Sequence, residues 1–192
     1  MRPGGGQAAD HPLGHFLPQP VVRILDPGSF VFSVDFNPEE LEILYVERTP
    51  NSCMVKGLTG YRSGSERTIA NPLLKLKRGI YQVRWADTAV MFVYGKDDSG
   101  TWHIVKKEND VVADLYSTRE PIRSLCPLNE ETCLFFEGTV LKVLSLHGAV
   151  DTIKDFESLP DGVAVNAAGD IFLSFTTGIM RLRSDSQTML TT

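Results

Sequence analysis

Cysteine is scarce in this chain of 192 residues, which contains only Cys53, Cys126 and Cys133. The number is odd and no pair has the Cys-x-x-Cys spacing, so the sequence does not predict a disulfide framework. Cys126 and Cys133 fall in apolar, strand-like runs, where cysteine usually acts as a small hydrophobic side chain. This usage indicates a reducing compartment, and we expect a cytoplasmic location.

Long apolar runs and the common catalytic motifs are also missing. No run approaches the roughly 20 apolar residues that a membrane span needs, and no membrane association is expected. The first seven residues lack the apolar core of a secretory signal. Gly-x-Ser-x-Gly, Gly-x-x-x-x-Gly-Lys-Ser/Thr and His-Glu-x-x-His do not occur. The enzyme classes that these motifs mark are therefore not indicated, and we predict no catalytic residue.

Basic residues are fewer than acidic ones: the chain has 19 Lys and Arg residues and 24 Asp and Glu residues, which gives a net charge of −5. A mildly acidic domain does not attract a phosphate backbone, so we do not expect a nucleic-acid partner. The hydrophobic fraction of 42% and the charged fraction of 22% are values of a globular domain with a real core.

Glycine and proline are concentrated at the start of the chain, in residues 1–19. A segment so poor in apolar side chains does not bury enough surface to offset the entropy lost on ordering. We therefore predict a disordered leader over residues 1–19 and a folded domain over residues 20–192. His11 and His15 are four residues apart here, but without a helix to present them together the spacing predicts no metal site.

Short apolar runs separated by turn residues fill the rest of the chain. Residues 30–36 alternate Phe, Val and polar side chains, and Gly95 to Gly100 has the composition of a hairpin loop. Helical periodicity is almost absent. The runs form four groups of four strands, at about residues 30–70, 80–117, 121–154 and 162–192, with residues 20–25 as a candidate extra outer strand.

The groups recur at a regular interval. The last residues of their first strands, Phe36, Trp85, Cys126 and Val165, are 49, 41 and 39 residues apart. A period of about 40 residues with four strands per period is typical of a propeller blade. We therefore predict an all-β fold, namely a β-propeller or an open propeller arc of about four four-stranded blades.

The last group also carries a family resemblance. Asp161-Gly162-Val163-Ala164-Val165, followed by a turn with Gly169 and an apolar strand, resembles an NHL repeat; the best match spans residues 159–183. The consensus of that repeat runs Pro-x-Gly-Val-Ala-Val-Asp, a turn with Gly and an apolar strand. The other groups keep the strand rhythm and are similar to WD-repeat blades, although the Trp-Asp dipeptide is absent. The resemblance implies the NHL/WD-like β-propeller superfamily.

The resemblance also raises the question of ring closure, because NHL and WD propellers usually close with six or seven blades. Three arrangements agree with four groups: a closed four-bladed ring, an open arc completed by another chain, or part of a larger protein. An open arc exposes blade faces rich in Phe, Leu and Val, which favours self-association.

We predict that the protein is a non-enzymatic interaction platform with a protein partner, because repeated blades present a broad surface with many loops. Two alternatives come from the resemblance. One is a metal-dependent propeller hydrolase of the lactonase kind. The other is RNA binding of the NHL type, which requires a basic face from Lys75, Lys77, Arg78 and Arg84.

The lactonase alternative has candidate metal ligands. Asp35, Asp87, Asn129 and Asn166 lie at or just after the end of a first strand in four successive groups. Lactonase-type propellers hold one divalent cation in the channel with Glu, Asn and Asp, and hard cations accept such oxygen ligands. We interpret these residues instead as turn formers that bond the backbone, and we predict no cofactor. Similarly, we interpret His103 and His147 as surface or hydrogen-bonded side chains.

Overall fold

The computed structural model describes residues 28–37, 42–59, 66–68, 79–87, 90–109, 111–183 and 187–190. The predicted leader, residues 1–19, and the candidate strand at residues 20–25 lie outside the described residues. The described part is built of β-strands, and they form four separate sheets of four strands each. Within the described ranges there is no helix with the length and apolar character that a membrane crossing requires.

Each sheet is one segment of the chain. The first consists of β1 (Phe30–Asn37), β2 (Glu42–Arg48), β3 (Cys53–Thr59) and β4 (Glu66–Thr68). The second consists of β5 (Ile80–Asp87), β6 (Val90–Lys96), β7 (Trp102–Glu108) and β8 (Val111–Thr118). The third consists of β9 (Ile122–Pro127), β10 (Thr132–Glu137), β11 (Val140–Ser145) and β12 (Val150–Asp155). The fourth consists of β13 (Gly162–Val165), β14 (Ile171–Phe175), β15 (Gly178–Leu182) and β16 (Gln187–Leu190).

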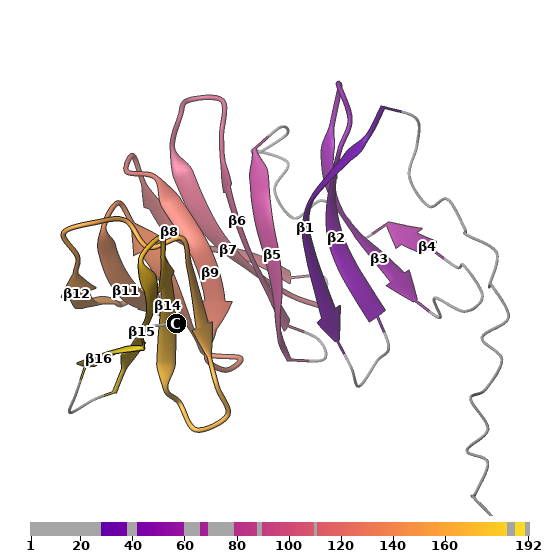
Figure 1. The fold of residues 1–192 in the computed structure, drawn as a ribbon. Helices are drawn as coiled ribbons and strands as arrows, with labels where there is room; N and C mark the ends of the chain where they lie inside the picture. The colour runs from indigo at the N-terminus through magenta and orange to yellow at the C-terminus, as the bar shows by residue number, and fades with distance from the viewer. Residues whose placement is uncertain are drawn as a thin grey trace, which may run out of the picture.

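The strands of every sheet pair antiparallel in chain order, so each sheet is a four-stranded meander. Neighbouring sheets meet through their first strands, because β1 packs on β5, β5 on β9 and β9 on β13. Figure 1 shows the first strands near the middle of the molecule, with β4 and β12 at its outer edges. This is the arrangement of propeller blades around an axis, and the predicted all-β propeller of four blades is confirmed.

Turn chemistry explains how the sequence closes these hairpins. Between β13 and β14, the side-chain oxygen of Asn166 accepts hydrogen bonds from the backbone N–H groups of Ala168 (3.0 Å) and Asp170 (2.9 Å). Gly169 has a φ of 81°, a left-handed conformation that glycine adopts without steric cost. Asn166 therefore supplies the side-chain hydrogen bonds of this turn, and Gly169 supplies its left-handed backbone conformation.

Apolar side chains form three cores, and each core lies between two consecutive blades. The first joins Leu44 and Val46 of blade 1 to Val83 and Val93 of blade 2. The second core lies between blades 2 and 3 and contains Phe92, Ile104 and Phe135. The third lies between blades 3 and 4 and contains Phe136, Leu173 and Leu182. Interlocking of blade faces is therefore what holds the four sheets together.

Strand β10 shows why strands of the middle blades have continuously apolar sequences. Cys133 and Phe135 point into the second core, whereas Leu134 and Phe136 point into the third. All four side chains have no exposed surface. A strand buried on both faces cannot alternate apolar and polar residues, because neither of its faces meets water.

We predict that Phe135→Ala destabilises the protein strongly, because this buried ring also packs on Tyr116 with ring centroids 5.3 Å apart. The free energy of unfolding in urea should fall by about 3–5 kcal/mol. Phe30→Ala is the matched control, because Phe30 is 66% exposed, and it should change that free energy by less than about 0.5 kcal/mol. Equal losses for the two variants would contradict the assignment of the second core.

The cysteines give a second prediction. Cys53 and Cys133 are fully buried, and burial, assisted by nearby Cys126, raises the pKa of the Cys133 thiol to about 12. A thiol must deprotonate and be accessible to react. Iodoacetamide should therefore leave both residues unmodified in the native protein and modify them after unfolding in guanidinium, as measured by peptide mass spectrometry. Rapid native labelling of Cys133 would contradict the packing of β10.

Candidate binding sites

The oxygens of the candidate metal ligands are bonded to the backbone wherever their side chains are described. Asp35 Oδ2 accepts a 2.7 Å bond from the backbone N–H of Trp85, which links blade 1 to blade 2. Asn129 Oδ1 accepts the backbone N–H groups of Glu131 and Thr132, both at 2.8 Å. Asn166 bonds its own turn in the same way. The side chain of Asp87 lies outside the described residues.

The structure places Asn129 and Asn166 in separate turns, and none of the bonds among the described residues joins one candidate ligand to another. Within the described ranges, no three of His, Cys, Asp and Glu lie close enough together to hold a metal ion. The backbone bonds are those of turn-forming side chains. The divalent-cation site stays a prediction of the lactonase alternative.

His103 is held between two carboxylates. Its Nδ1 lies 2.9 Å from Asp114 Oδ2, and its Nε2 lies 3.2 Å from Asp97 Oδ2. The hydrogen bond from the Ser99 hydroxyl, followed by those from His103 and from backbone N–H groups, lowers the pKa of Asp97 well below its usual range. The imidazole therefore ties β7 to β8 and to the β6–β7 turn.

A charged cluster fixes the last blade. Asp170 accepts hydrogen bonds from the guanidinium of Arg181, from Arg183 Nε at 2.9 Å and from the Asn166 side-chain amide at 3.1 Å. The bond from Arg181 is the main cause that lowers the pKa of Asp170 to about 2, although burial acts in the opposite direction. The Arg181 guanidinium also lies over the ring of Phe172, 5.8 Å from its centroid. The cluster joins the β13–β14 turn to β15.

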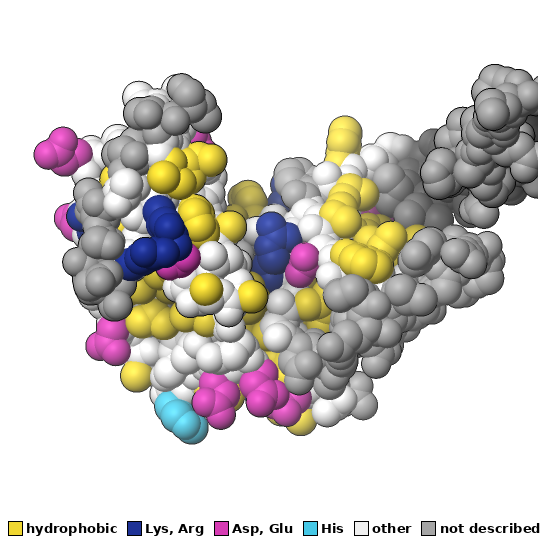
Figure 2. All heavy atoms as spheres, turned by 60° about the horizontal axis from the view of Figure 1, so that its bottom comes forward, with side chains coloured by type: hydrophobic (Ala, Val, Ile, Leu, Met, Phe, Trp, Pro, Cys, Tyr) yellow, Lys and Arg dark blue, Asp and Glu magenta, His cyan; other side chains and the backbone are white. Residues whose placement is uncertain are grey.

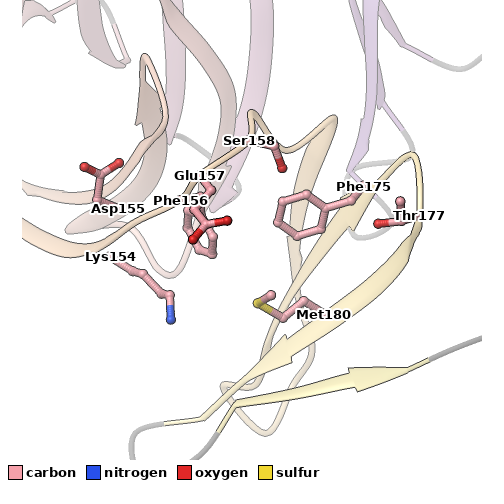
Figure 3. A pocket seen from close by; sticks show the side chains of 8 residues that line it. All are labelled: Lys154, Asp155, Phe156, Glu157, Ser158, Phe175, Thr177 and Met180. Atoms are coloured by element: carbon pink, nitrogen blue, oxygen red, sulfur yellow. The ribbon is translucent and has the colours of Figure 1, made fainter.

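A cavity of about 460 Å³ lies between blades 3 and 4 (Figure 3). Phe156, Phe175 and Met180 supply its apolar wall, with the two phenylalanine ring centroids 5.8 Å apart. In Figure 3, Phe175 and Met180 project into the space from the last blade, and Lys154 approaches it from the other side. Thioether and aromatic walls adapt to ligands of varied shape. The rest of the lining is polar or charged, so the cavity suits a ligand with both apolar and polar groups; these residues are Lys154, Asp155, Glu157, Ser158 and Thr177.

A smaller cavity of about 340 Å³ lies where the first strands of blades 1, 2 and 3 meet. Its lining is polar and includes Ser33, Gln82, Arg84, Tyr94 and Ser124. The sequence alone does not predict this pocket, because its residues come from four strands, β1, β5, β6 and β9, of three different blades. Only the packing of the blades brings them together.

The end blades leave apolar side chains exposed. On β1, the exposed fractions are 39% for Val31, 54% for Val34 and 46% for Phe36. These three residues pair with Glu47, Tyr45 and Ile43 of β2, so their side chains share one face of the sheet. On the last blade, Ile179 and Leu190 are cross-strand partners and are 41% and 42% exposed. We call these two sets the end strips. Figure 2 shows a notch between the last blade, on the left, and the first blade, on the right, with hydrophobic side chains on both sides.

The first end strip is confined to the innermost strand. Val34 of β1 pairs with Tyr45 of β2, so the two side chains lie on one face of the sheet. Tyr45 is only 2% exposed, and Lys56 and Glu47, which form an ion pair at 2.6 Å, are also buried. The exposed apolar surface of blade 1 is therefore a narrow row along β1, beside the notch, rather than a whole sheet face.

Comparison with known proteins gives the fold and no closer relationship. No family model and no curated protein matches the chain. Among solved structures, a nidogen/laminin complex matches with a TM-score of 0.68 and 10% identity, covering 86% of this chain and 66% of that chain. A gluconolactonase from Xanthomonas campestris matches with a TM-score of 0.64 and 14% identity, covering 84% and 62%. The SapL1 lectin in complex with alpha methyl fucoside matches with a TM-score of 0.61 and 12% identity, covering 86% and 64%.

These matches show a propeller fold alone, because the identities are so low. The chain spans about two thirds of the length of each of the three structures. They include both binding proteins and a gluconolactonase, so they do not decide between a binding protein and an enzyme.

The Asp170 cluster predicts a pH dependence of stability. The folded pKa of about 2 lies below that of an unfolded aspartate, so the carboxylate stabilises the fold above the unfolded pKa. This contribution is lost as the pH falls through the folded pKa. Asp170→Asn should therefore lower the thermal midpoint near neutral pH, and the deficit relative to wild type should shrink between about pH 4 and about pH 2.

Circular dichroism melting curves at several pH values measure this deficit. Asp151→Asn is the control, because Asp151 is an exposed residue of β12, and it should leave the midpoint unchanged. A deficit for Asp170→Asn that stays constant down to the lowest pH would show that the charge of Asp170 does not stabilise the blade.

Proposed function

We propose that this protein is a non-enzymatic interaction platform that binds another protein along the notch between its end blades. The row of exposed Val31, Val34 and Phe36 on one face of β1 is the observation that carries the proposal. Clustered apolar side chains on a protein surface mark interaction sites, whereas single exposed ones are ordinary. Phe36 also provides an aromatic anchor of the kind that contributes most to protein-binding energy.

The shape of the notch supports a protein partner over a small ligand. Apolar surface lies on both of its sides, along β1 and around Ile179 and Leu190. A small molecule contacts one pocket, whereas a protein segment or domain can cover both end strips at once. Burial of both strips supplies a hydrophobic driving force in proportion to the apolar area removed from water.

The chemistry of the described residues supports binding rather than catalysis. Asp35, Asn129 and Asn166 use their side-chain oxygens to bond the backbone. Among the described residues, the side-chain partners of His103 are carboxylates, not a nucleophile that it could activate. One similar structure is a complex of two proteins, which agrees with a binding role, whereas the similar gluconolactonase keeps the hydrolase alternative open to test.

Site-specific crosslinking tests the proposal. A photoreactive phenylalanine analogue at position 36, introduced into the full chain in its source cells, should give one dominant adduct that mass spectrometry identifies. The same analogue at Ile153, which is 42% exposed on β12, is the control and should not give that adduct. The purified partner should then form a stoichiometric complex, and Val31→Ser with Phe36→Ser should weaken it at least about tenfold, with Ile153→Ser unchanged.

Four results would contradict the proposal. The adducts at positions 36 and 153 could be identical, or the reconstituted complex could be insensitive to Val31→Ser with Phe36→Ser. If the sole adduct were a second copy of this chain, the surface would serve self-association and not the binding of another protein. Calcium-dependent hydrolysis of an aldonolactone that is lost in Asp35→Asn would favour the metal-dependent hydrolase.

A further inference from the structure

The first strands of three successive blades carry a β-bulge at the same level. The pairing register shifts between Val31 and Ser33 on β1 and between Ile80 and Gln82 on β5. On β9 two residues, Ser124 and Leu125, lie opposite the single residue Phe135 of β10. The pairing of β13 with β14 contains no such shift. A bulge bends its strand and re-aims the side chains around it, so three aligned bulges shape one local surface.

These bulges line the polar cavity of about 340 Å³, which we call the bulge pocket. Its polar lining consists of Ser33, Tyr81, Gln82, Arg84, Tyr94 and Ser124. Each of the three bulges therefore contributes residues to the same pocket. Bulges are common beside binding sites, where they turn side chains that a regular strand would direct elsewhere.

The bulge on β9 is held in a strained conformation by its neighbours. Ser124 has a φ of 52°, a left-handed value that residues other than glycine rarely adopt. The backbone N–H of Leu125 donates a 2.7 Å hydrogen bond to the side-chain oxygen of Gln82 on β5. Strained residues that the surroundings fix in this way are concentrated at functional sites.

The pocket presents hydrogen-bond donors. Burial raises the pKa of the Tyr94 phenol, whereas a backbone hydrogen bond from Ser124 and the charges of Arg123 and Arg84 act in the opposite direction. Tyr94 lines the pocket, and a phenol hydroxyl has one proton that it can donate to an acceptor there. Tyr81 stacks on Tyr94 with an interplanar angle of 4° and closes one side.

Arg84 is the charged side chain in the lining of the pocket. Arg84 lies in the wall, where its Nη1 donates a 3.0 Å bond to the backbone oxygen of Val34, and Arg123 lies beside Ser124 on β9. The neighbouring carboxylate is Asp35, with Oδ1 3.9 Å from Arg84 Nη1, and its Oδ2 is bonded to the backbone. A guanidinium has five N–H donors in a planar fork, so the bond to Val34 leaves others for a ligand.

We propose that the bulge pocket binds a carboxylate, with Arg84 and the Tyr94 hydroxyl as its donors. A planar carboxylate matches the guanidinium fork and accepts further bonds from hydroxyl and amide groups in the same wall. The carboxylate can belong to a free small molecule or to an acidic side chain of a protein. Val34 of the β1 end strip also lines the pocket, but the two proposed donors, Arg84 and Tyr94, belong to neither end strip. The inference does not depend on the proposed partner, so the two proposals can fail separately.

Nuclear magnetic resonance titration of the full chain tests the pocket. Sodium citrate is added at constant ionic strength, so that general screening of charge does not change. We expect saturable shifts of the backbone amides of Gln82, Ser124 and Leu125. Arg84→Gln should weaken binding at least about tenfold, and Tyr94→Phe, which keeps the charge and the ring, about threefold. Arg119→Gln removes the same charge at an exposed residue outside the pocket and should leave the affinity unchanged.

Two further titrations, one with an acetylated, amidated Gly-Glu-Gly peptide and one with glycerol, complete the test. Tighter binding of citrate than of an acetylated, amidated Gly-Glu-Gly peptide indicates a free small molecule, and the reverse order indicates an acidic side chain. Either order supports the pocket. Shifts that do not saturate, that are unchanged in Arg84→Gln, or that glycerol reproduces at the same concentration would overturn it.

Discussion

Contact between the apolar faces of consecutive blades is the interaction on which this structure depends. Four sheets have three interfaces, and each interface contains one buried core. A four-stranded sheet alone is marginal in water, and burial of its apolar faces supplies the missing stability. Strand β10 illustrates the constraint most clearly, because Phe135 and Phe136 enter different cores from opposite faces of one strand.

The number of neighbours that each blade has also explains which apolar side chains are exposed. Among the described residues, the two middle blades each share a core with two neighbours, whereas the first and last blades each share one core, and Phe36 and Ile179 on these end blades stay exposed. Stability and binding are thus linked: the apolar composition that joins blades also leaves the end strips available for a partner. The bulge pocket depends on the same packing, since it forms where the first strands of three blades meet.

The repeat and the fold could be predicted because turn residues and apolar runs are local signals with a fixed period. The bulge pocket could not, because Gln82 and Leu125 are 43 residues apart and lie in different sheets, so only the packing of the blades brings them together. The contact between Asp170 and Arg181 could have been predicted, since Asp170 directly precedes β14 and Arg181 lies on the adjacent strand β15. Equivalent positions of Asp35 and Asn129 suggested a shared site, but in the structure each of these side chains bonds nearby backbone.

Backbone hydrogen exchange tests the central claim that blade-to-blade cores hold the molecule together. Exchange is slowest where opening a hydrogen bond requires unfolding of the core around it. The account predicts the slowest amides in β6 and β10, whose side chains enter two cores each, and much faster exchange in the outer strands β8 and β16. Equal protection across all four strands of a blade, or faster exchange in β6 and β10 than in β8, would contradict it.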